Sequence, residues 1–228
     1  MRGASLLVLA AVGAQAGLIK SRAVIAHDAV VGFAQSASTL ELTWKPWLKV
    51  VNGCVPFPAV DSAGNTGGGL SPTGGSSDDC SSSTGQVYTR GAQYDDYYGL
   101  MYSWYMPKDE PSDGLGHRHD WECIVVWLDS SASDASIVGL STSAHGGFST
   151  ITSSFPLDGT RPKIQYYSVW PVDHQLGTTD TVGGEQPLIS WDDLTAAART
   201  ALQDTDFGDA NVPFKDGNFE SNLAEAYP

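Results

Sequence analysis

Residues 100–128 read LMYSWYMPKDEPSDGLGHRHDWECIVVWL and contain two strand patterns around one polar segment. In residues 100–106, large apolar and aromatic side chains alternate between two faces, which is typical of a β-strand. Residues 122–128 are rich in β-branched and apolar side chains and predict a second strand. The polar residues 107–122 between them predict a connecting loop that leads into this second strand.

Further strand patterns extend in both directions along the chain. Residues 136–142 and 163–170 are rich in β-branched or aromatic side chains, and two short candidates lie at 24–25 and 30–33. Gly, Pro, Ser, Asp and Asn separate these runs. Many short strands with few helices predict a mainly β protein, a single-domain β-sandwich with peripheral helices.

One helix is predicted late in the chain. Ser190 is a candidate N-cap, and the acids that follow it suit the start of a helix. Apolar residues then recur at helical spacing, and Gly208 provides a stop signal. These residues are Leu194, Ala197, Ala198, Ala201 and Leu202.

The first residues have the pattern of a secretory signal peptide. Arg2 precedes a short apolar run, and Ala14-Gln15-Ala16 has the small-x-small pattern of a cleavage site. We therefore expect residues 1–16 to be removed and residues 17–228 to form one secreted domain.

The charge balance is strongly acidic. The chain has a formal charge of −14, and removal of residues 1–16 takes away one arginine and no acid, which leaves −15. An anionic nucleic acid or lipid surface would repel such a protein, so we expect no nucleic-acid partner. A membrane target would have to be recognised through a specific head group or a bridging cation.

Three cysteines in a secreted chain leave one unpaired. Cys54 and Cys80 flank the Gly/Ser-rich stretch 61–85, and a disulfide between them would stabilise the fold by about 3 kcal/mol through loop closure. Cys123 lies in an apolar run and is expected to be a buried free thiol. Metal-binding cysteines are the alternative, but the sequence has no CxxC pair to support them.

The polar segment carries a candidate metal site. Asp120 and Glu122 point to the same side of an extended backbone, because side chains alternate with period two. His117 has the opposite parity and joins them only if the chain turns near Gly116 or His117. Asp109 is a further oxygen donor across the loop. Three carboxylates favour calcium or magnesium, whereas the imidazole leaves manganese or zinc open.

The alternative is a solvated loop whose acids pair with Arg118 and Lys108 and whose histidines are exposed. A nucleophilic active site is disfavoured, because no serine or cysteine stands out as a partner for the histidines. We therefore do not expect an enzyme.

The segment Gly116-His117-Arg118-His119-Asp120-Trp121-Glu122 is identical to the heptapeptide that defines the necrosis- and ethylene-inducing-like proteins. Other parts of the chain also resemble this family. They are residues 27–31, 52–54, 58–61, Gly91, 101–109, 143–145, 170–171, 191–192 and 216–219. The chain departs from the usual family pattern at Met106 and Cys123.

The resemblance implies a β-sandwich similar to actinoporins and some fungal lectins, with one cysteine pair, Cys54 and Cys80. It implies a calcium or magnesium ion held by four side chains, which are Asp109, His117, Asp120 and Glu122. Cytolytic members bind glycosylinositol phosphorylceramide, a plant plasma-membrane sphingolipid, through its sugar head group. Trp170, Asp173 and His174 resemble the residues of the membrane and head-group loop. The alternative for Trp170 is a packed loop anchor, which is the more frequent role of a tryptophan beside a proline.

The resemblance implies a secreted cytolysin and leaves two other functions open. A non-cytolytic member would be sensed as a microbial pattern, and residues 99–122 resemble the segment that plant receptors perceive. A metal-dependent hydrolase would need an open coordination position and a positioned base or water.

Overall fold

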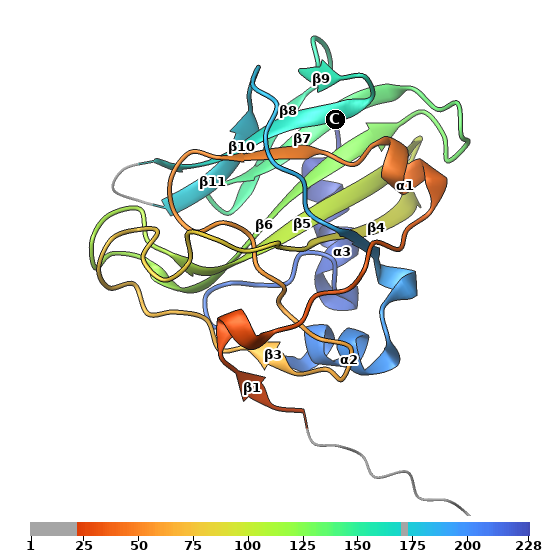
Figure 1. Cartoon of the computed structure of the whole chain (residues 1–228). Helices are drawn as coiled ribbons and strands as arrows, with labels where there is room; N and C mark the ends of the chain where they lie inside the picture. The colour runs from red at the N-terminus through yellow and green to blue at the C-terminus, as the bar shows by residue number, and fades with distance from the viewer. Residues whose placement is uncertain (1–21, 170–172) are drawn as a thin grey trace, which may run out of the picture.

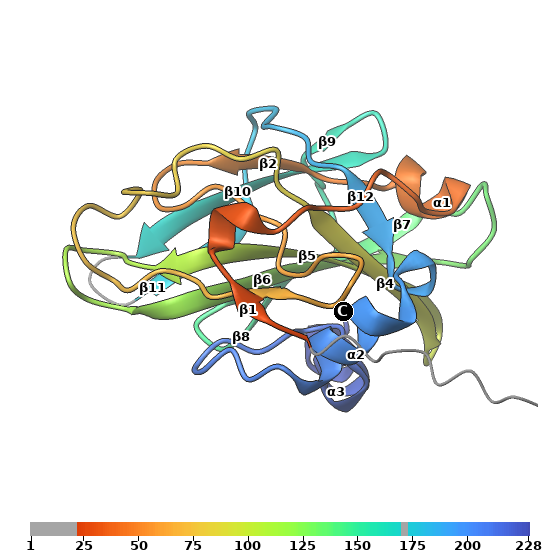
Figure 2. The same ribbon diagram turned by 60° about the horizontal axis from the view of Figure 1, so that its bottom comes forward.

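The computed structural model describes residues 22–169 and 173–228, so the expected signal peptide and Trp170 lie outside the described residues. Two sheets face each other as a sandwich, which confirms the predicted fold class (Figures 1 and 2). The larger sheet has the order β12-β4-β5-β6-β7-β8. The smaller sheet has the order β11-β10-β2, with β9 pairing with β10.

The bounds of the elements are as follows. The strands are β1 (Val24–Ile25), β2 (Trp47–Val50), β3 (Thr66–Gly67), β4 (Val87–Tyr94), β5 (Tyr97–Asp109), β6 (His117–Leu128), β7 (Ile137–Ala144), β8 (Gly147–Ile151), β9 (Leu157–Asp158), β10 (Arg161–Val169), β11 (Asp173–Thr178) and β12 (Leu188–Ser190). The helices are α1 (Thr39–Thr43), α2 (Ala196–Asp204) and α3 (Asp216–Ala226), with single 3-10 turns at His27–Ala29 and Trp191–Asp193.

The central pair of the larger sheet is the β5–β6 hairpin, and both of its faces are buried. On one face, Trp121 packs against Phe207 and Phe214, which belong to the helical C-terminal region. On the other face, Tyr166 of the smaller sheet reaches Asp120. Helix α3 is fixed to the larger sheet where Trp127 Nε1 donates to the carbonyl of Ala226. The hairpin is therefore the layer that both halves of the protein contact (Figure 2).

The predicted loop 107–122 is mostly strand, which corrects the sequence expectation. β5 continues to Asp109 and β6 begins at His117, so the turn comprises only residues 110–116. Lys108 and Glu110, both buried, form an ion pair at its base, and Lys108 Nζ also donates to the Gly75 carbonyl at 2.9 Å. The polar composition at the base of the turn therefore reflects a buried ion pair.

Two other local predictions were wrong in detail. Residues 30–33 form no strand, because the Phe33 amide donates to the side chain of Gln86. The predicted helix is a 3-10 turn followed by α2, whose cap is Thr195, and α2 ends at Asp204, before the Gly208 stop signal. Ser190 Oγ donates to Glu41 at 2.9 Å and does not cap the helix. Helices α1 and α3 were not predicted.

The cysteine predictions are confirmed. Cys54 and Cys80 form a disulfide, and Cys123 is buried and free. Burial raises the pKa of the Cys123 thiol well above its usual value, and the neighbouring Glu122 carboxylate raises it further. The Cys123 thiol is therefore held in its neutral form, which is not the nucleophilic one.

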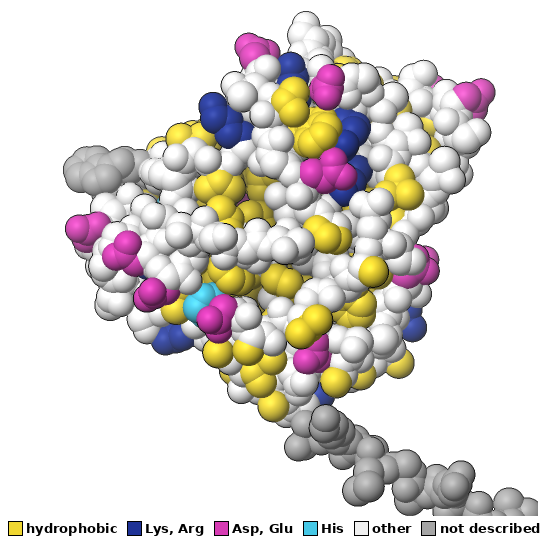
Figure 3. Space-filling model, in the orientation of Figure 1, with side chains coloured by type: hydrophobic (Ala, Val, Ile, Leu, Met, Phe, Trp, Pro, Cys, Tyr) yellow, Lys and Arg dark blue, Asp and Glu magenta, His cyan; other side chains and the backbone are white. Residues whose placement is uncertain are grey.

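Acidic side chains are spread over the face shown in Figure 3, and several border the end where the β5–β6 hairpin turns. Lysine and arginine gather mainly towards β2 and β9. Among the described residues, no helix is long and apolar enough to cross a membrane.

Candidate functional site

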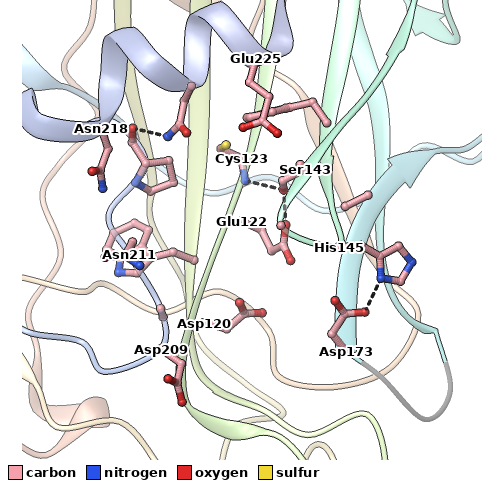
Figure 4. A pocket seen from close by; sticks show the side chains of 18 of the residues that line it. Asp120, Glu122, Cys123, Ser143, His145, Asp173, Asp209, Asn211, Asn218 and Glu225 are labelled. Carbon is pink, nitrogen blue, oxygen red and sulfur yellow. Dashed lines mark hydrogen bonds and ion pairs between the residues drawn. The ribbon is translucent and has the colours of Figure 1, made fainter.

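The candidate site is a cavity of about 530 Å³ that lies along the edge of β6, next to the end of β7; we call it the β6 cavity. β6 pairs with β7 only from Ile124 onwards, and before that point His117 and residues 120–123 of β6 line the cavity. In Figure 4, Asp120 and Glu122 lie in the middle, His145 and Asp173 lie on one side, and Asn211 and Asn218 lie on the other.

Three buried carboxylates form the acidic centre of the site. Asp109, Asp120 and Glu122 expose 2%, 7% and 7% of their surface. Tyr166 donates to Asp120 at 2.7 Å, and Ser143 donates to Glu122.

An irregularity in the hairpin brings His117 to the same side as these acids. In the strand register of the hairpin, Lys108 of β5 lies opposite both Arg118 and His119 of β6, and His119 has a φ of +64°. Such a left-handed residue interrupts the alternation of faces, so His117 can line the cavity together with Asp120. The turn expected near Gly116 or His117 is this irregularity, which lies at Arg118 and His119.

A contact with the backbone of His119 selects the tautomer of the His117 ring. Its Nδ1 lies 2.8 Å from the carbonyl oxygen of His119, so Nδ1 carries the proton as donor. In the neutral ring, Nε2 then has a free lone pair, and it lies 3.7 Å from Asp109 Oδ2. A histidine held in this way is suited to bind a metal through Nε2.

Burial and mutual repulsion dominate the electrostatics of the acids. Burial, with repulsion from Asp109, raises the pKa of Asp120 from 3.8 to about 7, although the Tyr166 hydrogen bond opposes this. Burial and the Asp120 charge raise the pKa of Glu122 well above its usual value. The site therefore holds excess negative charge that is costly near neutral pH.

The described residues provide no lysine or arginine partner for this charge. Lys108 pairs with Glu110, and Arg118 donates to Gly68, Gly69 and Ser71. The alternative expected from the sequence, in which the acids pair with Lys108 and Arg118, is therefore wrong for Asp120 and Glu122.

The side chains of the site are of the right chemical type for a divalent cation, but they are not arranged around one point. Buried carboxylates for which the described residues provide no lysine or arginine partner, next to an imidazole, are a donor set for calcium or magnesium. Within residues 22–169 and 173–228, however, no three acidic, histidine or cysteine side chains converge closely enough to hold an ion. Asp109 itself does not line the cavity. Ligation by all four predicted residues therefore requires side-chain rotations.

The structure places the two predicted head-group residues that it describes, Asp173 and His174, in different surroundings. Asp173 lines the cavity and pairs with His145 Nδ1 at 3.2 Å (Figure 4). His174 is buried: its Nδ1 donates to Asp109 at 2.6 Å and its ring stacks on Tyr166. His174 therefore orients the Asp109 carboxylate from the buried side.

Sequence reasoning missed several residues of the site. Tyr166 and Ser143 hydrogen-bond to the acids from strands far away in the chain, and the side chains of α3 form one wall. The tyrosine belongs to an ordinary strand pattern and gave no signal. Ser143 and His145 lie in a segment that matched the family, which was the only available indication.

Comparisons with known proteins place the chain in one family. The family model described as necrosis inducing protein (NPP1) matches residues 38–226. The chain is 54% identical over 215 residues to NLP effector protein 10 of Phytophthora capsici, covering 90% of this chain and 92% of that protein. It is 53% identical to the necrosis-inducing protein NPP1 of Phytophthora nicotianae, with 90% and 91% covered.

Solved structures show the same fold. NLPPya in complex with mannosamine has a TM-score of 0.86 and 52% identity, and covers 90% of this chain and 100% of its own. NLPPya has also been solved with glucosamine, at a TM-score of 0.85. A non-toxic protein, HaNLP3, matches with a TM-score of 0.84 and 38% identity over 89% of this chain and 99% of its own.

Proposed function

Because the chain belongs to the necrosis-inducing protein (NPP1) family, we propose that it is a secreted, cation-dependent cytolysin that binds the sugar head group of plant glycosylinositol phosphorylceramide. Binding would be followed by leakage of the host plasma membrane. The signal peptide at residues 1–16 would direct secretion. The proposal assigns no catalytic residue, and the protein acts as an effector of host cells.

The observation that carries the proposal is the buried acidic centre, for which the described residues provide no lysine or arginine partner. Asp120 and Glu122 have raised pKa values because they are buried close to one another and to Asp109. Calcium or magnesium would offset this repulsion and give an acidic protein one positive point for sugar hydroxyls. Two complexes of one relative, NLPPya, with the amino sugars mannosamine and glucosamine support a glycan as the partner.

The chain's own residues divide the work. Tyr166 and Ser143 hold the carboxylates of Asp120 and Glu122 in place, and His174 holds Asp109. Asp173 lies at the rim of the cavity and is the proposed head-group contact.

Trp170, which is outside the described residues, is proposed to enter the bilayer after the head group is bound. The amphipathic indole ring of tryptophan is most stable at the boundary between water and hydrocarbon.

Vesicle leakage tests the proposal. Vesicles that contain plant glycosylinositol phosphorylceramide should release a trapped dye when the protein and calcium or magnesium are present, and a chelator should prevent this. Glu122→Gln should abolish both binding and leakage, because it removes a charge and keeps the shape. Trp170→Ala should bind vesicles normally without leakage. Leakage that is unchanged by the chelator would contradict the dependence on a cation. Leakage by Trp170→Ala would show that Trp170 is a packed loop anchor.

A second candidate function is recognition without lysis. The similarity to HaNLP3, a non-toxic protein with the same fold, favours it. In that case residues 99–122 would be perceived by a plant surface receptor as a microbial pattern. Infiltrated leaves would then show defence signalling without rapid ion leakage, whereas a cytolysin gives both. Turnover of a lipid or glycan would instead indicate a hydrolase.

A further inference from the structure

The β6 cavity has a second half that the proposed function does not use. One half contains Asp120, Glu122 and Asp173, described above. The other half is bordered by α3 and by the segment before it, on the far side of β6 in Figure 4. Its polar lining residues are Asp209, Asn211, Asn218, Ser221, Asn222 and Glu225.

Backbone groups of β6 join the two halves. The Tyr105 carbonyl accepts a hydrogen bond from the Phe57 amide, so the backbone of Tyr105 points away from β6. Tyr105 is opposite Trp121, which must therefore direct its own N–H and C=O to the other edge. In the described part of the chain, no strand covers that edge, because pairing with β7 begins at Ile124. A ligand crossing from one half to the other would meet a polar backbone edge.

The α3 wall presents carboxamides that are already held in position. Asn218 Nδ2 donates to the Val212 carbonyl at 3.0 Å, and Asn222 Nδ2 donates to the Pro213 carbonyl at 2.9 Å. Each bond uses one N–H, which leaves the side-chain oxygen and the second N–H without a protein partner among the described residues. Preorganised groups that both donate and accept are suited to sugar hydroxyls.

The charge of the cavity selects among sugars. Its lining includes five carboxylates, from Asp120, Glu122, Asp173, Asp209 and Glu225, and neither lysine nor arginine. This lining repels a sugar acid or phosphate in the α3 half and favours a neutral sugar or an amino sugar.

We propose that the α3 half is a second sugar subsite, which binds a neutral or amino sugar of an oligosaccharide whose neighbouring residue lies over Asp120 and Glu122. This inference rests on the proposed function, because it extends the glycan bound there. The oligosaccharide would cross the edge of β6 at Trp121. Asn218 and Asn222 would donate to and accept from its hydroxyls, and Glu225 would pair with an amino group.

The test compares a short and a long ligand. Glucosamine serves as the short probe, and the oligosaccharide released from plant glycosylinositol phosphorylceramide serves as the long one. In the unaltered protein, the oligosaccharide should bind about tenfold more tightly than glucosamine, as expected for two or three additional hydrogen bonds. It should also shift the side-chain amide NMR signals of Asn218 and Asn222, and glucosamine should shift them little.

Two variants on α3 form a matched pair. Ser221 is exposed and lines the cavity, whereas Ala224 is exposed on the same helix and does not. Ser221→Tyr should fill the α3 half. It should abolish the tenfold higher affinity for the oligosaccharide without lowering the affinity for glucosamine. Ala224→Tyr should bind both ligands like the unaltered protein.

Three outcomes would overturn the subsite. They are equal affinity for both ligands, an unshifted pair of asparagine signals, and a Ser221→Tyr variant that retains the advantage. If Ser221→Tyr weakens binding to lipid vesicles but not to the free oligosaccharide, α3 contacts the membrane and the subsite is also wrong. If the unaltered protein binds neither sugars nor vesicles, the proposed function is wrong, and this inference falls with it.

Discussion

Asp120 should make the cation-free protein less stable as the pH rises. The folded state holds a proton on Asp120 up to about pH 7, whereas an ordinary aspartate loses it near 3.8. Between these values the folded state binds more protons than the unfolded state, so the free energy of unfolding falls with increasing pH. At about 1.4 kcal/mol per pKa unit, the loss attributable to Asp120 is about 4 kcal/mol.

Urea unfolding, followed by the fluorescence of the seven tryptophans, would measure this loss. In metal-free buffer, the unaltered protein should lose about 4 kcal/mol more than Asp120→Asn between pH 4 and pH 8. The asparagine still accepts the Tyr166 hydrogen bond, so the variant isolates the charge. Asp209→Asn is the matched control, because this exposed acid lies in the same cavity and should leave the pH dependence unchanged.

Equal pH dependence in the unaltered protein and Asp120→Asn would refute the reasoning about burial and repulsion. Calcium provides a separate test of the cation. At pH 8 and a hundredfold excess over its dissociation constant, it should stabilise the unaltered protein by about 2.7 kcal/mol and Asp120→Asn by much less. Equal stabilisation of both proteins would show that the ion binds elsewhere.

Other expected outcomes concern the framework around the site. Cys54→Ser should lower the free energy of unfolding by about 3.5 kcal/mol, because it opens the loop closed to Cys80, and thermal unfolding with and without reductant would check this. Lys108→Met should cost about 3–5 kcal/mol in urea unfolding, because Glu110 would remain as an unpaired buried charge; an effect below about 1 kcal/mol would contradict the buried pair. Gly116→Ala should lower the melting temperature, because the new Cβ would lie 2.2 Å from a backbone carbonyl oxygen of β5; an unchanged melting temperature would show that the turn relaxes.

The sequence by itself determined the class of fold, the cysteine pairing and the family. Alternation in residues 100–106 predicts a strand because side chains on extended backbone point to opposite faces. Cys54 and Cys80 flank a flexible stretch, and Cys123 lies within an apolar run. The heptapeptide at residues 116–122 identifies the family because it is a long, contiguous match. Each of these signals is local in the chain.

Only the tertiary structure decided which side chains meet in the site. Tyr166, Ser143 and α3 lie far from the heptapeptide in sequence, and no local pattern indicates that they border it. The parity of His117 was also inaccessible, because it depends on how Lys108 pairs across the hairpin and on the left-handed backbone of His119. The raised pKa of Asp120 has the same origin, since burial and neighbouring charges are set by the packing of two sheets rather than by adjacent residues.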